Sequence, residues 1–268
     1  MVPLTANHKV SRSSPPGPAK GYALEDFASC GNALDYVLLG DYPLADKWLT
    51  RSLAWNPKDS ESQYYLGRTK YNENRFAEAV SAFEQCLKLD PKNVKAEDNL
   101  GLSFAGLGLN EEAATAYQTA IAWQSQLLVK NPGPYIDLGS LFLDENKTDV
   151  AISNLFQAVE ISPRDSKAHE LLGKAYARLD QLRKAQTELE KALDLSPQST
   201  NLHCMLAPVY RKQGLTEKAK LEFDRCAAMH VNRFFAGASL SVKKFKRPRW
   251  KRLWRGGKEG QSSSPQRK

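Results

Sequence analysis

The sequence predicts an all-α protein built as an α-solenoid of about six helix-turn-helix units. The first observation is an alanine that recurs every 34 residues, with one interval of 38, at Ala45, Ala79, Ala113, Ala151, Ala185 and Ala219. The second is a Leu-Gly pair that keeps the same phase at 66–67, 100–101, 138–139 and 172–173. A period held over so many units is the signature of a repeat architecture, and each unit is long enough for two amphipathic helices.

The unit is clearest between Ser166 and Ser199. Small and large apolar residues stand there in a fixed order: Leu172, Gly173, Tyr176, Ala185, Leu189, Ala192 and Pro197. That order resembles the tetratricopeptide repeat (TPR) pattern. The resemblance covers residues 26–233, with units starting near 26, 60, 94, 132, 166 and 200. It implies a right-handed superhelix whose first helices line a concave groove.

Each unit can be justified physically. Gly173 and Ala185 are small where the two helices of a unit cross closely, and Pro197 ends the second helix because proline has no N–H and clashes with the preceding turn. Every unit leaves an apolar face bare until its neighbour covers it, so the whole array folds together.

Taken in order along the chain, the units and the segments that flank them differ from one another. Residues 1–25, rich in Pro and Ser, are expected to be a disordered leader before a degenerate first unit. In the third unit we expect the second helix to run on through Trp123 and Leu127 to Pro132, because the interval of 38 adds about one helical turn. Residues 234–268 are expected to form a capping segment followed by a basic disordered tail.

Composition and motifs argue against several classes of protein. The four cysteines form no CxxC motif, which favours buried reduced thiols over disulfides. No apolar run reaches about 18 residues and no secretory signal is visible, so we expect a cytoplasmic protein. Phosphate loops and catalytic constellations are absent, and adjacent His203 and Cys204 cannot share a helix face as metal ligands. We therefore expect no enzyme, no cofactor and no metal.

The resemblance implies which side chains line the groove. By the family's pattern, the predicted peptide-binding residues are Tyr64, Tyr65, Arg68, Asn99, Asp137, Lys167, Lys174 and Arg178. Such a surface would bind a peptide or partner helix, making the protein an interaction scaffold. A solvated helix face with half-covered tyrosines is an equally good interpretation of this pattern. The carboxylate clamp of chaperone-binding repeats does not match, so no chaperone C-terminus is predicted.

The positive charge is concentrated at the C-terminal end of the chain. Residues 231–268 hold twelve Lys and Arg and one acid, whereas residues 1–230 hold 26 basic and 29 acidic residues. The predicted basic tail comprises Lys243, Lys244, Lys246, Arg247, Arg249, Trp250, Lys251, Arg252, Trp254 and Arg255. Interleaved cations and aromatics suit weak binding to nucleic acid or an anionic lipid surface, which is the alternative function. A nuclear import signal and a merely solubilising end are the other interpretations.

Overall fold

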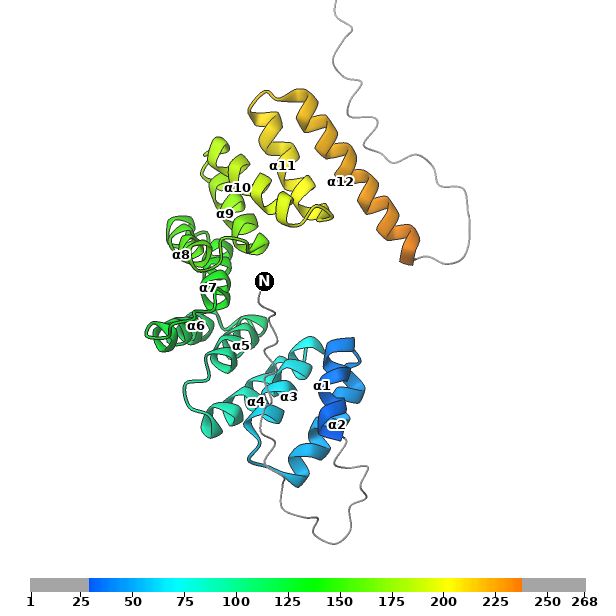
Figure 1. Ribbon diagram of the computed structural model, residues 1–268. Coiled ribbons are helices and arrows are strands. Elements are labelled where there is room, and N and C mark those ends of the chain that lie inside the picture. The colour runs from blue at the N-terminus through cyan, green and yellow to red at the C-terminus, as the bar shows by residue number, and fades with distance from the viewer. Residues whose placement is uncertain (1–28, 238–268) are drawn as a thin grey trace, which may run out of the picture.

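The computed structural model describes residues 29–237, which form twelve α-helices and no strand (Figure 1). The helices are α1 (Ser29–Leu39), α2 (Tyr42–Trp55), α3 (Ser60–Asn72), α4 (Phe76–Leu89), α5 (Val94–Gly106), α6 (Asn110–Gln124), α7 (Gly133–Asp144), α8 (Thr148–Ile161), α9 (Ser166–Arg178), α10 (Leu182–Leu195), α11 (Thr200–Lys212) and α12 (Thr216–Gly237). They pack as six consecutive pairs, α1 with α2 through α11 with α12. The predicted all-α solenoid is confirmed.

The turn inside each pair has one recurring backbone feature. A residue with positive φ, between 56° and 79°, stands at the same repeat position in all six turns. It is glycine at Gly40, Gly108 and Gly214, and Asn or Asp in the other three turns. These are the residue types that adopt a left-handed conformation most readily, so the turn can reverse the chain in very few residues.

Polar side chains start several of the first helices. Asp59, Asn93 and Asp165 each accept a hydrogen bond from a backbone N–H in the first turn of α3, α5 and α9, at 2.9–3.2 Å. Each cap follows two residues after a proline of the preceding loop. Proline ends one helix and the capping residue begins the next, which sets the length of each unit.

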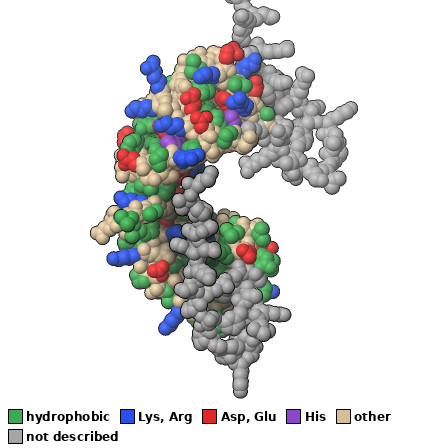
Figure 2. Space-filling view, viewed as in Figure 1, with side chains coloured by type: hydrophobic (Ala, Val, Ile, Leu, Met, Phe, Trp, Pro, Cys, Tyr) green, Lys and Arg blue, Asp and Glu red, His purple; other side chains and the backbone are tan. Residues whose placement is uncertain are grey.

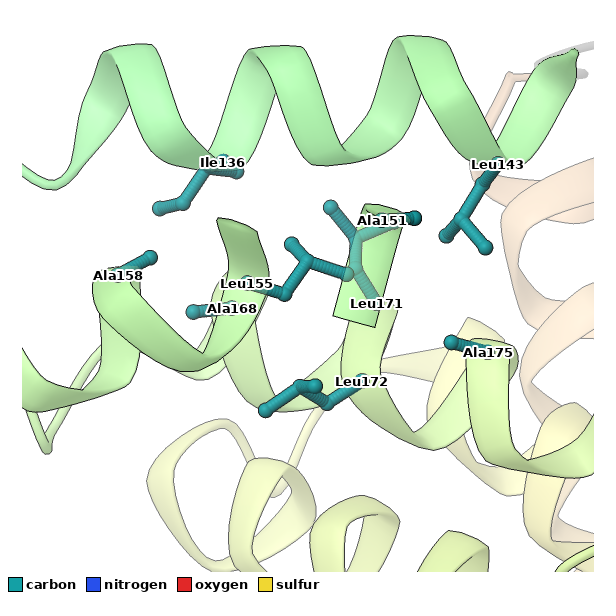
Figure 3. Packing of buried hydrophobic residues seen from close by; sticks show 9 residues of the cluster. All are labelled: Ile136, Leu143, Ala151, Leu155, Ala158, Ala168, Leu171, Leu172 and Ala175. Carbon is teal, nitrogen blue, oxygen red and sulfur yellow. The ribbon is translucent and has the colours of Figure 1, made fainter. Parts of the chain in front are cut away.

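The core is divided along the array. A buried cluster between α7, α8 and α9 contains Leu143, Leu155 and Leu172 together with Ala151 and Ala168 (Figure 3). The recurring alanine is at most 3 % exposed in every pair. Each cluster contains side chains from successive pairs, so no pair completes its core alone.

Two expectations were wrong, namely the elongated second helix of the third unit and the absence of disulfides. Helix α6 ends at Gln124, because the Gln124 side chain bonds both the N–H (2.8 Å) and the C=O (3.0 Å) of Asn131 and closes the inserted residues into a loop. Cys204 and Cys226 form a disulfide between α11 and α12, with their Cα atoms 5.1 Å apart. Their helices pack face to face, which brings together thiols that are 22 residues apart in the sequence. Cys86 is free and buried, as expected.

Candidate functional site

The concave side of the array is formed by the odd-numbered helices. Each of them packs on the next odd-numbered helix, from α1 against α3 to α9 against α11, whereas no two even-numbered helices pack together within the described residues. First helices are therefore closer together than second helices, and the array curves around them. Figure 1 shows α5 and α7 on the inner side of the arc and α6 and α8 on the outer side. We call the inner surface of α1, α3, α5, α7, α9 and α11 the concave face.

An aromatic group lies on α3, at positions that the repeat pattern assigned to the groove. The rings of Tyr64 and Tyr65 meet edge to face at 5.3 Å, and Tyr64 also packs against Phe83 at 6.0 Å. The Arg68 guanidinium carbon lies 5.9 Å from the centre of the Tyr64 ring. Half-buried aromatic rings held by such contacts offer a rigid apolar surface with a cation beside it.

Asn99 follows on α5. Its side-chain N–H donates to the carbonyl of Lys95, one turn earlier, at 2.7 Å. The contact holds the amide in one orientation and leaves an oxygen and a second N–H for another molecule.

Two carboxyl groups come next, Asp98 on α5 and Asp137 on α7. Asp98 is only 6 % exposed, and its Oδ1 atom has no hydrogen-bond partner. Burial, with Asp137 nearby, raises the pKa of Asp98 to about 8. Burial also raises the pKa of Asp137 to about 6, against the opposing effect of Lys167. Asp98 was not among the predicted site residues, since an acid on a helix is ordinarily solvated.

The predicted cations of α9 are already engaged within the array. Lys167 pairs with Glu170 at 3.1 Å, and Lys174 lies 3.7 Å from Asp144. Arg178 donates to the carbonyl of Leu143 near the end of α7, so it links two neighbouring first helices. Lys174 and Arg178 also line a recess of about 380 Å³ between α9, α10 and α11. The space-filling view shows the hollow of the arc on its right side (Figure 2).

Two buried histidines belong to the interior, and their pairing with glutamates was not predicted from the sequence. His169 on α9 contacts Glu188 on α10 at 2.6 Å through Nδ1 and the Pro163 carbonyl at 3.0 Å through Nε2. One repeat later, His203 pairs in the same way with Glu222. The signal was present in the sequence, because both the histidine and the glutamate recur 34 residues apart. These pairs join the two helices of a unit.

The remaining predictions fall elsewhere. The basic tail lies outside the described residues, as do the leader and the segment from residue 238 onward. Within residues 29–237, no helix is both long and apolar enough to cross a membrane.

Comparison with known proteins identifies repeats of one family in two parts of the chain. Two profiles described as Tetratricopeptide repeat match residues 60–93 and 166–199. The PEX5-related protein of Homo sapiens is 34 % identical over 83 residues, which is 31 % of this chain and 13 % of that protein. The Peroxisomal targeting signal receptor of Saccharomyces cerevisiae is 31 % identical over 120 residues, 45 % of this chain and 19 % of that protein. The chain thus spans less than a fifth of either relative.

A solved structure extends the likeness in fold over most of the chain. The crystal structure of the APC/C hetero-tetramer Cut9-Hcn1 matches with a TM-score of 0.69. It covers 79 % of this chain and 41 % of that chain, at 19 % sequence identity. The likeness concerns the course of the helices.

Proposed function

Because the chain is a tetratricopeptide repeat protein, we propose that its concave face binds an extended peptide or a helix of a partner protein. The array supplies shape and side chains, and it performs no chemistry on the partner. Helical repeat arrays curve into elongated surfaces of this kind, and each repeat adds a new row of side chains to the surface.

One observation carries the proposal. The first helices pack on one another without interruption from α1 to α11, so their side chains form one continuous surface. We assign to this surface the aromatic rings of Tyr64 and Tyr65, the amide oxygen of Asn99 and the charged groups of Asp137 and Lys174. An extended peptide presents the same variety of groups in sequence, namely apolar side chains, backbone amides and charges.

Hydrogen exchange tests the proposal. A random peptide library is selected on the full-length protein, and the tightest binder is added while backbone exchange is followed by mass spectrometry. We expect protection in α3, α5, α7 and α9, with α6 and α8 unchanged. Protection confined to the even-numbered helices, or a selection that yields no binder, would contradict the proposal.

A further inference from the structure

Among the buried titratable side chains of residues 29–237, one carboxyl has an oxygen without a hydrogen-bond partner. Lys70, also nearly buried, bonds Asp46 at 2.7 Å. Glu222, 6 % exposed like Asp98, is held by His203 and by Arg225. Asp98 has neither an ion pair nor a hydrogen bond at its buried oxygen. Leaving a buried carboxyl unpaired is unfavourable, so an unpaired one on a concave face calls for a reason outside the fold.

The Asp98 carboxyl points from α5 toward the start of α7. A Cβ atom at Gly133 would lie 2.9 Å from Asp98 Oδ2, so the missing side chain leaves room for the carboxyl between the two helices. The first turn of α7 does not satisfy it. The Gly133 N–H already donates to Asn131 Oδ1 at 2.9 Å, and Pro134 has no N–H.

A second acid lies near the first. Asp137 lies one turn further along α7 and is close enough to raise the pKa of Asp98. Burial raises the pKa of Tyr64 and Tyr71 on α3 and of Tyr117 on α6, and the charge of Asp98 or Asp137 adds to the effect in each. The nearby cation is Lys167 on α9, whose ammonium group is held by Glu170. The two cations near these groups are thus engaged elsewhere, Lys167 by Glu170 and Arg68 at the Tyr64 ring.

We propose that Asp98 and Asp137 form a subsite for a lysine or arginine side chain of the bound peptide. The inference rests on the proposed function and specifies its partner chemistry. A long side chain can lay its apolar stem along the tyrosine rings and bring its charged head to the carboxyl groups. A metal ion is a poorer fit, because the described residues contain no cluster of three or more metal-ligating side chains.

The test measures preference for a basic residue. Peptides selected from a random library on the full-length protein are resynthesised with each Lys or Arg replaced by norleucine, and affinities are measured by titration calorimetry. We expect one basic position whose replacement weakens binding at least tenfold. In Asp98→Asn and Asp137→Asn, the same replacement should change affinity less than threefold. Glu112→Gln, an exposed acid on α6, is the charge-matched control and should behave as wild type.

The outcomes separate this inference from the function on which it rests. Binders without any basic position sensitive to the two variants would overturn the subsite and leave the scaffold function standing. A library without binders would overturn both. Melting temperatures identify a structural role, because replacing an unpaired buried carboxyl by an amide should leave the melting temperature of Asp98→Asn unchanged or higher. A variant that melts lower and keeps the basic preference would overturn the subsite.

Discussion

Gly173 on α9 faces Leu189 on α10 so closely that a Cβ atom at position 173 would lie 2.5 Å from the leucine Cγ. The relation recurs through the array with different partners. The equivalent distance is 2.6 Å at Gly67 from Phe83 and at Gly101 from Tyr117. The four units from α3 to α10 therefore each fit a large side chain of the second helix against a glycine of the first helix.

The first prediction concerns this contact. Gly173→Leu should lower the free energy of unfolding by about 2–4 kcal/mol, because the added side chain must displace Leu189 or separate the helices. Urea denaturation followed by circular dichroism measures it. Gln181→Ala, at an exposed position in the adjoining turn, is the control and should change stability little. Equal midpoints for both variants and wild type would mean that the helix crossing has been misplaced.

The second prediction concerns the link between the last two helices. Removing the Cys204–Cys226 disulfide by Cys226→Ser should destabilise the protein by about 3 kcal/mol. The disulfide closes a loop between residues 22 apart in the sequence, and its loss gives the unfolded chain more conformational freedom. Peptide mapping without reductant should recover the two cysteines in one linked species. If both residues instead react with an alkylating agent in the folded, unreduced protein, the disulfide assignment is wrong.

The third prediction is a dependence of stability on pH. The folded pKa values of Asp98 and Asp137 are raised to about 8 and about 6, whereas an unfolded aspartate titrates near pH 4. Between these values the native state keeps protons that the unfolded chain has lost, so this contribution makes stability fall as pH rises. The slope is at most about 1.4 kcal/mol per pH unit for each proton.

The measurement is urea denaturation of wild type and Asp98→Asn at several pH values from 4 to 8. The variant should lose less stability than wild type across this range. Parallel curves for the two proteins would show that Asp98 titrates in the folded protein as it does in the unfolded chain.

The fourth prediction concerns the buried His–Glu pairs. Glu222→Ala should cost about 1–3 kcal/mol, because it leaves the enclosed His203 ring without one of its acceptors. Asp224→Ala, exposed on the same helix, is the matched control. Thermal melts of the two variants that coincide would argue against a structural role for the pair.

The repeat pattern was readable because its causes are local to each unit. The recurring Ala, Gly and Pro act within one helix crossing or one turn, so Ala185 and Gly173 were placed correctly from spacing alone. Asp98 was missed for the opposite reason. Its burial depends on α7, whose start is positioned by the loop that Gln124 closes on Asn131. The length of that insertion was visible in the sequence, but its conformation was not.

On the concave face, too, the positions within a repeat were predictable from the sequence, whereas the contacts between repeats were not. The family's pattern assigned Tyr64 and Asn99 to the first helices, and the structure places them on α3 and α5. The pattern could not show that Arg178 donates a hydrogen bond to the Leu143 carbonyl, because this contact joins different repeats. Likewise, the facing of Cys204 and Cys226 comes from the packing of two whole helices rather than from their spacing.

The most direct test of a peptide-binding concave face is the affinity of a selected peptide for four single variants of the full-length protein: Tyr65→Ala, Arg68→Ala, Asn99→Ala and Lys174→Ala. We expect Asn99→Ala to weaken binding by about 1–3 kcal/mol without changing the melting temperature, because a polar group of the peptide loses its partner. Affinity unchanged in all four variants would contradict the assignment and place the binding site elsewhere on the protein.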